Sequence, residues 1–170
     1  MKLVAIDFET ADLLPDSACA IGVAVVENDR IGSVLHRLIR PPRRHFRFTY
    51  IHGIEWEHVA GEPDFGMVWD QLAPIVEDAD YLLAHNASFD SRVLTACCTG
   101  SGRAVPAVPF VCTVKLARAA WSIRPTRLPD VCRHLHIPLQ HHDARSDALA
   151  CATIGLTALR QGHDMAMTTQ

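Results

Sequence analysis

The chain has 170 residues, of which 49% are hydrophobic and 21% charged, and its formal net charge is −3 at pH 7. This length suits one domain, and the hydrophobic fraction is ample for a single core. No apolar run approaches the length of a membrane span, and an expected strand near the N-terminus leaves no room for a signal peptide. We therefore expect a soluble, cytoplasmic protein with a single domain over residues 1–162 and a frayed, polar tail over 163–170.

The hydrophobic pattern predicts alternating strands and helices. Three strands come first, over residues 2–8, 19–27 and 31–40, and the last two form a hairpin across Glu27-Asn28-Asp29-Arg30. The elements expected after them are a helix over 64–78, a strand over 80–84, a helix over 88–98, a short strand around 109–112, and helices over 113–121, 128–136 and 144–161. Three strands followed by strand–helix alternation predict an α/β layered domain with a mixed sheet.

Two acids follow the first apolar run, Lys2-Leu3-Val4-Ala5-Ile6, which is typical of a buried strand. Side chains two apart on a strand project to the same face, so Asp7 and Glu9 point together. Such a pair repels itself and loses hydration unless a cation or a proton compensates. The pair therefore indicates a site for chemistry. The alternative is that the strand ends at Asp7 and both side chains are solvated.

Between residues 31 and 50 the chain has five arginines and no acid, with aromatic residues among them. The arginines are at positions 37, 40, 43, 44 and 47, and the aromatic residues are Phe46, Phe48 and Tyr50. Arginines for phosphates and aromatic faces for bases are what a single-strand nucleic-acid groove requires. An equally good interpretation is a solvated edge strand and loop whose charges prevent aggregation.

A second acid follows a short apolar strand, Tyr81-Leu82-Leu83-Ala84, through the segment His85-Asn86-Ala87-Ser88-Phe89-Asp90. Ser88 is expected to be a helix N-cap, with Asp90 in the first turn. Taken alone, an acid in a first turn is a partner of the helix dipole, worth roughly 0.3–1 kcal/mol.

The third polar segment, His141-His142-Asp143, precedes the last predicted helix. His142 and Asp147 are five residues apart, which is about 140° around a helix, so they could not converge if both were helical. His142 is therefore expected on the loop, from which its ring could reach bound metal ions while Asp147 points in from the helix. The alternative is a solvated loop histidine beside an acid at the start of a helix.

Six cysteines, at positions 19, 97, 98, 112, 132 and 151, mostly interrupt apolar segments and show no C-x-x-C spacing. Buried, reduced thiols are therefore expected rather than disulfides. Cys132 lies near His134 and His136, but the helical core spacing of residues 128, 131, 132 and 135 favours packing over a zinc site.

Together the three acidic segments resemble the DEDDh family of 3′-to-5′ exonucleases, which includes the proofreading epsilon subunit of bacterial DNA polymerase III and ribonuclease T-like enzymes. Residues 7–10 match the first motif, 84–90 the second and 142–148 the third, in the family order and at similar separations. Residues 38–42, 51–54 and 112–118 are supporting matches. Many members read D-x-E-T-T-G where this chain has Ala11-Asp12, which alters only the expected shape of the following loop.

The resemblance implies a ribonuclease H-like fold whose mixed five-stranded sheet is a three-stranded meander followed by parallel strands, flanked by helices. The strands that carry the first two motifs would then lie side by side. The domain over residues 1–162 would be a single exonuclease domain.

The resemblance also implies a role for each motif residue. Asp7 would bridge two metal ions, Glu9 and Asp147 would complete one site, and Asp90 would reach the second largely through water. All-oxygen ligation favours Mg²⁺ or Mn²⁺, and two such ions about 4 Å apart stabilise both the attacking and the leaving oxygen of a displacement. His142 would be the general base, since an unperturbed histidine titrates at about pH 6.5.

His141 is a rival base, although it is one residue too early for the family spacing. The remaining residues that the resemblance assigns would bind the nucleotide. They are Phe8, Thr10, His52, Ile54, Asn86 and Phe89.

The expected activity is metal-dependent removal of 5′-mononucleotides from the 3′ end of DNA, single-stranded or frayed. The alternatives are an exoribonuclease with the same site, a non-catalytic nucleic-acid-binding module associated with a polymerase, and a structural domain with coincidental motifs. Nucleic acid is the expected partner, and a DNA polymerase or another replication or repair protein is a candidate protein partner. The sequence does not indicate the oligomeric state.

Overall fold

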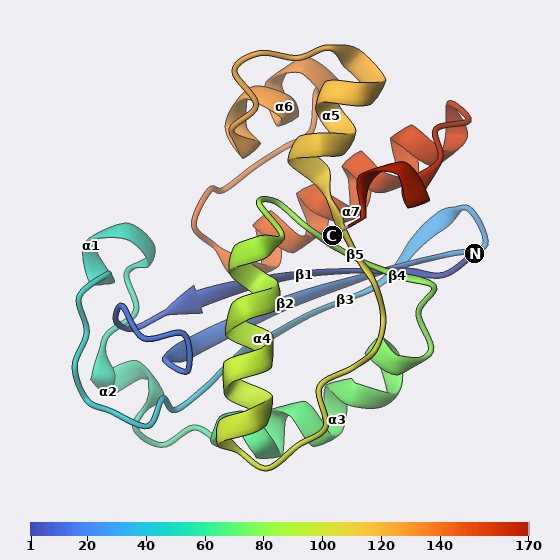
Figure 1. Cartoon of the computed structure of the whole chain (residues 1–170). Helices are drawn as coiled ribbons and strands as arrows, with labels where there is room; N and C mark the ends of the chain where they lie inside the picture. Colours follow the sequence, from blue (N-terminus) through green and yellow to red (C-terminus); the bar gives the residue numbers. More distant parts are fainter. Residues whose placement is uncertain (170) are drawn as a thin grey trace.

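A computed structural model describes residues 1–169 of the chain (Figure 1). One sheet contains the strands β1 (Leu3–Thr10), β2 (Ala18–Glu27), β3 (Arg30–Leu38), β4 (Tyr81–Ala84) and β5 (Phe110–Cys112). Their order is β3-β2-β1-β4-β5. The first three strands pair antiparallel, whereas β4 and β5 run parallel to β1. The predicted α/β class, the meander, the hairpin between β2 and β3 and the pairing of the two motif strands are confirmed.

The helices agree with the prediction where they are long. They are α3 (Phe65–Glu77), α4 (Ser88–Gly100), α5 (Thr113–Trp121), α6 (Leu128–Leu135) and α7 (Ala144–Arg160). Two further helices, α1 (Thr49–His52) and α2 (Trp56–Val59), were not predicted, because a helix of 4 residues is too short to show a periodic pattern.

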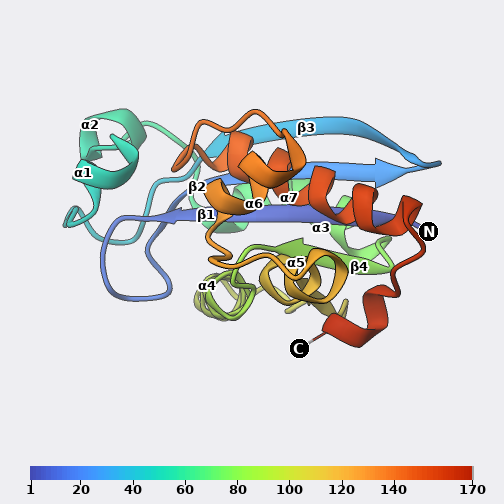
Figure 2. The same cartoon turned by 90° about the horizontal axis from the view of Figure 1, so that it is seen from above.

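Alternate residues of β1 divide the helices between the two faces of the sheet. Val4, Ile6 and Phe8 pack in a core with α3 and α4, whereas Leu3 and Ala5 pack in a second core with α5, α6 and α7. Figure 2 shows α7 lying across the sheet along β1 and β2. Since side chains alternate along a strand, the two acids that follow Ala5 at every second position project toward the face that α7 covers.

Gly22 of β2 allows α7 to approach this point closely. Gly22 pairs with Asp7 in the β1–β2 register. A Cβ atom on Gly22 would lie 1.8 Å from the carbonyl oxygen of Ala144, the first residue of α7. A side chain at position 22 would therefore displace the start of α7, which carries the third acidic motif.

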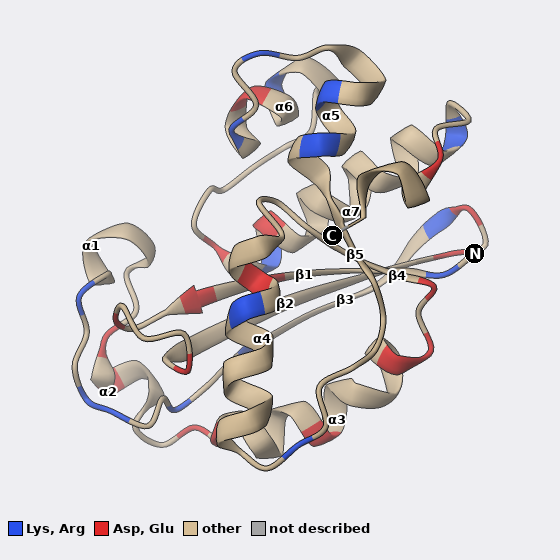
Figure 3. Ribbon diagram, viewed as in Figure 1, with Lys and Arg blue, Asp and Glu red and all other residues tan. Residues whose placement is uncertain are grey.

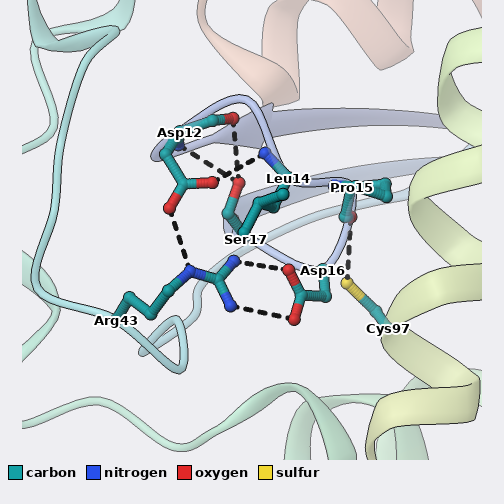
Figure 4. A network of polar contacts seen from close by, with 7 residues as sticks. All are labelled: Asp12, Leu14, Pro15, Asp16, Ser17, Arg43 and Cys97. Atoms are coloured by element: carbon teal, nitrogen blue, oxygen red, sulfur yellow. Dashed lines mark hydrogen bonds and ion pairs between the residues drawn. The ribbon is translucent and has the colours of Figure 1, made fainter.

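The loop between β1 and β2 is fixed by a polar network around Arg43 (Figure 4). The Arg43 Nε donates to Asp12 Oδ2 at 3.1 Å, and the rest of the guanidinium pairs with both carboxylate oxygens of Asp16. Asp12 also accepts from the backbone N–H of Leu14 at 2.8 Å. These contacts hold the pKa of Asp12 and of Asp16 below their ordinary values, the side-chain hydrogen bond from Arg43 being the largest lowering effect on each. Arg43 thus stabilises a loop of the protein.

The C-terminal segment is packed where the sequence predicted fraying. Met165–Thr168 form a short 3₁₀ helix, η1, and Met165 is 1% exposed in the core with α5, α6 and α7. Thr169 forms a bridge with Val111 of β5. The expected fraying is therefore wrong for residues 165–169, because an apolar side chain anchors them. The division of the chain at residue 162 stays a prediction, and Gln170 lies outside the described residues.

The cap of α4 differs from the prediction, whereas the cysteines agree with it. Ser88 is not the N-cap of α4, because the helix begins at Ser88 itself and the cap residue Ala87 has no capping side chain. All six cysteines are buried and free, as predicted. Within residues 1–169, none of the helices has the length and apolarity needed to cross a membrane.

We expect Gly22→Ala to lower the free energy of unfolding by about 1–3 kcal/mol, because the added methyl group overlaps the start of α7. It should also weaken binding of divalent cations. Denaturant unfolding with and without Mg²⁺ measures both effects. Gly61→Ala is the matched control, because a Cβ atom there meets nothing within 4 Å. Equal stability of the two variants would contradict the close approach.

Candidate active site

Three carboxylates meet at the end of β1. Oxygen atoms of Asp7, Glu9 and Asp147 all lie within 4.8 Å of one another. Asp7 is partly buried, whereas Glu9 is 9% and Asp147 3% exposed. The first two come from one face of β1 and the third from the first turn of α7. The structure therefore brings together acids that are about 140 residues apart in the sequence.

Asp90 completes the acidic cluster from α4. Its Oδ1 accepts the backbone N–H of Phe8 at 3.1 Å, and its side chain is 1% exposed. β4 pairs with β1 only as far as Ala5, so at Phe8 the hydrogen-bonding edge of β1 has passed the end of its parallel neighbour. If β4 were longer, one of its carbonyl oxygens could accept the Phe8 N–H; instead, the Asp90 carboxylate accepts it. This hydrogen bond fixes the Asp90 carboxylate beside Asp7.

The first turn of α7 organises the loop that precedes it. Asp143 is the N-cap and accepts the backbone N–H of Ser146 at 2.8 Å. The hydroxyl of Ser146 accepts the backbone N–H of Gln140 at 2.8 Å. Asp147 Oδ2 accepts the backbone N–H of His142 at 3.0 Å. Short-range hydrogen bonds thus hold residues 140–143 against the helix that carries the acid.

The two loop histidines stack on each other, with ring centroids 3.8 Å apart. His141 Nδ1 lies 3.0 Å from Asp147 Oδ2. His142 has a backbone φ of 67°, a left-handed conformation that is uncommon for a residue with a side chain. The position of His142 on the loop is as predicted, but it is His141 whose ring contacts the acid here. Both rings face the cavity described below.

Burial and mutual repulsion perturb the acids strongly. Burial raises the pKa of Glu9 to about 8, with further contributions from the charges of Asp147 and Asp90. Burial likewise raises the pKa of Asp90 to about 8, despite the hydrogen bond from Phe8. The pKa of Asp7 is raised well above its ordinary value, first by burial and then by the charge of Asp90. Burial also raises the pKa of Asp147. Four acids in this arrangement cannot all be charged without a compensating positive charge.

The residues present fit divalent cations. Asp147 Oδ1 is buried and has no hydrogen-bond partner among the described residues, whereas its Oδ2 accepts the His142 N–H. A buried carboxylate oxygen without a partner is costly unless an ion or water occupies its vicinity. All donors in the trio formed by Asp7, Glu9 and Asp147 are oxygens, which suits Mg²⁺ or Mn²⁺.

A cavity of about 290 Å³ opens beside the acids. Of the residues predicted to bind a nucleotide, Phe8, Thr10, His52 and Phe89 line it. Ile54 does not, because its side chain packs on the small cluster around Ala11, Cys19 and Val59. Asn86 lines a second cavity instead.

Two residues of this cavity were not assigned from the sequence. Phe48 precedes α1 and Ile51 lies within it, and both line the cavity. Both belong to segments that the sequence analysis noted, Phe48 in the arginine and aromatic stretch and Ile51 beside His52. A place in the cavity could not be read from either segment, because it depends on the unpredicted helix α1.

His52 is held in one orientation. Its Nδ1 accepts the backbone N–H of Ile54 at 3.0 Å, and its Nε2 lies 3.1 Å from the carbonyl oxygen of Thr10. Since Nδ1 accepts, the Nε2 nitrogen carries the proton and donates to Thr10. Burial lowers the pKa of His52, which keeps this ring neutral. His52 therefore ties α1 to the end of β1 and shapes the cavity wall.

Comparison with known proteins identifies the family. A family model described as an exonuclease family, RNase_T, matches residues 4–154. The chain belongs to this family of 3′-to-5′ exonucleases. Members of this family are nucleases that act on nucleic acids, and metal binding is typical of them.

Curated relatives with more than 30% identity include a polymerase and an exodeoxyribonuclease. DNA polymerase III PolC-type of Thermotoga maritima is 31% identical over 157 residues, which are 90% of this chain and 11% of that protein. Exodeoxyribonuclease 10 of Escherichia coli is 32% identical over 120 residues, which are 68% of this chain and 47% of that protein. The chain thus spans less than half the length of either relative.

Solved structures agree on the fold. Exonuclease X in complex with 5′ overhanging duplex DNA is 25% identical with a TM-score of 0.78, covering 98% of this chain and 96% of that one. The nuclease domain of 3′hExo, a DEDDh family member bound to rAMP, has a TM-score of 0.80 at 18% identity, covering 95% and 92%. The ribonuclease H-like exonuclease fold is confirmed.

We expect the metal-free exonuclease to lose stability as the pH rises toward 8. The folded pKa of Glu9 is raised from 4.5, and that of Asp90 from 3.8, to about 8, so between these limits the folded state holds protons that the unfolded state has released. The free energy of unfolding then decreases with increasing pH. Denaturant unfolding in chelator at several pH values measures this decrease.

Two controls accompany this experiment. Mg²⁺ should restore more stability at about pH 8 than at about pH 5, because protons compete with the cation for the carboxylates. Asp7→Asn should flatten the pH dependence, because it removes one charge from the cluster. A metal-free stability that increases steadily from pH 5 to 8 would contradict the raised pKa values.

Proposed function

We propose that this exonuclease domain removes nucleoside 5′-monophosphates from the 3′ end of DNA, single-stranded or frayed, by a two-metal mechanism. The observation that carries the proposal is the convergence of Asp7, Glu9 and Asp147 around an unpartnered carboxylate oxygen. In a member of an exonuclease family, such a cluster beside an open cavity is best explained as a cation site.

Asp7, Glu9 and Asp147 would hold one divalent cation, and Asp7 with Asp90 would hold a second, largely through water at Asp90. When bound, the two ions would supply positive charge to the attacking and the leaving oxygen of the phosphodiester. The protein contributes a rigid frame. The Phe8 N–H fixes Asp90, and the His142 N–H fixes Asp147.

His142 would act as the general base. Its ring lines the cavity of about 290 Å³ together with Asp7 and Glu9, which is where an attacking water would be deprotonated. Burial lowers the pKa of His142, so the ring is neutral near pH 7 and able to accept a proton. His141 remains the rival, because its Nδ1 contacts Asp147 directly.

The cavity suits a nucleoside. Phe8, Phe48, Phe89 and Ile51 give it apolar and aromatic walls, and His52 contributes a polar edge. Stacking of a base on an aromatic side chain is worth roughly 1–3 kcal/mol and tolerates any base. These walls are suited to a terminal nucleotide with any of the bases.

DNA is the favoured substrate because curated relatives above 30% identity are named for DNA, as a DNA polymerase III and as exodeoxyribonucleases. The similarity to a PolC-type polymerase also supports a DNA polymerase or another replication or repair protein as a partner. A cytoplasmic location belongs to the same proposal, since all six cysteines are free thiols.

We expect Asp7→Asn to abolish hydrolysis of a labelled single-stranded DNA while the metal-free protein becomes more stable, because the variant removes a repulsive charge. Gel analysis of the products and thermal unfolding in chelator measure the two effects. Retained turnover would exclude Asp7 as a ligand. A variant that is both inactive and less stable would indicate a structural role.

We expect His142→Ala to lower kcat by about 10²–10⁴-fold while the protein still binds Mn²⁺, as a general base requires. His141→Ala is the matched comparison. Single-turnover rates report the hydrolysis step, and Mn²⁺ titration reports metal binding, so the two measurements separate these effects. If His141→Ala has the larger effect on kcat, His141 is the base.

We expect faster hydrolysis of a single-stranded oligodeoxynucleotide than of an oligoribonucleotide of the same sequence, with Mg²⁺ or Mn²⁺. The products should be 5′-monophosphates released stepwise from the 3′ end. A label at the 5′ end should therefore appear in progressively shorter fragments. A preference for RNA would favour the exoribonuclease, and no hydrolysis of either would favour the non-catalytic module.

A further inference from the structure

We propose that the basic lobe formed by residues 113–140, with the cavity below it, binds the phosphodiester backbone of the uncleaved strand on the 5′ side of the scissile bond. This inference rests on the proposed function, because it requires that the substrate enters as a 3′ end. It assigns a binding surface to α5, α6 and the segments that follow each of them, in place of the arginine stretch between residues 31 and 50.

Two cavities meet at the acidic cluster. The volumes of the two cavities are about 290 Å³ and about 330 Å³. Asp7, His141 and Asp147 line both. A strand whose scissile phosphate lies at these shared residues is within reach of both cavities.

The walls of the two cavities differ in chemistry. The first contains three phenylalanines, which suit one terminal nucleoside. The second is lined by His85, Asn86, Thr126 and Arg127, together with Val114 and Leu128. At a 3′ end, one side of the scissile phosphate holds a single nucleoside and the other holds the rest of the strand. The second cavity, which leads to a cationic side chain, fits the side that carries further phosphates.

The lobe beyond this cavity is strongly positive. Residues 113–140 contain five basic residues and one acid, Asp130. All five basic side chains are exposed: Lys115, Arg118, Arg124, Arg127 and Arg133. Figure 3 shows these charges as blue segments on α5, on the loop that follows it and on α6. Asp130 pairs with Arg127 and Arg133, so it offsets one positive charge and leaves an excess.

The lobe is anchored to the catalytic strands by His85. Its Nδ1 lies 2.8 Å from the hydroxyl of Thr113, and its Nε2 lies 3.0 Å from the carbonyl oxygen of Thr126. Arg118 Nε donates to the Thr126 hydroxyl at 2.9 Å. His85 directly follows β4, so the start of α5 and the segment before α6 are fixed relative to the acidic cluster. Because these hydrogen bonds fix its position, the basic surface of the lobe could bind phosphates next to the acidic cluster without a conformational change of the protein.

In the competing surface, the arginine stretch between residues 31 and 50, two arginines already make contacts within the protein. Within residues 31–50, Arg43 is held by Asp12 and Asp16, and the Arg44 guanidinium lies 5.1 Å from the centroid of the Trp56 ring. These two arginines stabilise loops and are less available to a strand. In the lobe, Arg127 also pairs with an acid, Asp130, but Arg127 lines the cavity itself, and Lys115 and Arg124 of the lobe are exposed.

The test compares two substrates that share the first cavity. The p-nitrophenyl ester of thymidine 5′-monophosphate places one nucleoside and one phosphate at the acids, with p-nitrophenolate in place of the leaving strand. A dodecamer of deoxythymidylate adds the uncleaved strand. For the double variant Arg124→Gln with Arg127→Gln, we expect kcat/KM for the dodecamer to fall about tenfold or more. For the ester, kcat/KM should stay within about twofold.

Salt dependence provides a second measurement. Each lost phosphate contact should reduce the slope of log kcat/KM against log salt by about 0.7 for a single strand. The matched control is Arg30→Gln with Arg160→Gln, which removes two exposed arginines at the far end of the sheet, beside the β2–β3 hairpin. This control should leave both substrates unaffected.

Three results would overturn the inference. They are an unchanged dodecamer rate in the lobe variant, an equal loss on both substrates, and a loss that instead follows Arg37→Gln with Arg40→Gln. If the wild-type protein hydrolyses neither substrate, the proposed function fails. Fluorescence anisotropy with the labelled dodecamer then still decides the inference, because the lobe variant must bind more weakly than the control variant.

Discussion

The repulsion among four carboxylates around Asp7 is the constraint on which the rest of the structure depends. Burial raises the pKa of Glu9 and of Asp90 to about 8, with like charges adding to the effect, so the metal-free fold keeps protons on these groups near neutral pH. Such a cluster persists only if the surrounding framework is stable enough to impose it. The framework is a sheet covered on both faces, with the acids at the end of its central strand. The same repulsion is the source of affinity for divalent cations, because a cation relieves it.

Local patterns predicted the elements and the acid pair of β1, because each depends on neighbours in the sequence, whereas Asp90 and Asp147 were assigned through the resemblance to the exonuclease family. Alternation along β1 placed Asp7 and Glu9 on one face, and the five-residue separation placed His142 on a loop. Features that depend on distant backbone could not be predicted in this way. Gly22 matters because Ala144 lies against it, and Arg43 is structural because Asp12 and Asp16 approach it from another loop. The arginine stretch was ambiguous in the sequence for this reason, since composition does not reveal which charges are already paired.

The two oxygens of Asp147 have separate tasks. Oδ2 accepts the His142 N–H and lies 3.0 Å from His141 Nδ1, while Oδ1 has no partner among residues 1–169. One oxygen therefore fixes the histidine loop, and the other is left free for the proposed cation. Because both oxygens belong to one rigid carboxylate, the position of the loop is coupled to the position of the proposed metal site. The left-handed backbone of His142 is consistent with a loop that is held in place by these contacts against its local preference.

His141 lies where the two cavities meet, since it lines both. In the proposed complex, the loop that carries the candidate bases would therefore contact both the terminal nucleoside and the leaving strand. A displacement of this loop would change the attack geometry and the exit of the strand together. The hydrogen bonds within residues 140–147 restrict such displacement, because the N-cap Asp143 and Ser146 tie the loop to α7. A Cβ atom at Gly22 would overlap Ala144 at the start of α7. The lack of a side chain at this position of β2 therefore allows the loop, Asp147 and the cavities that they line to lie where they do.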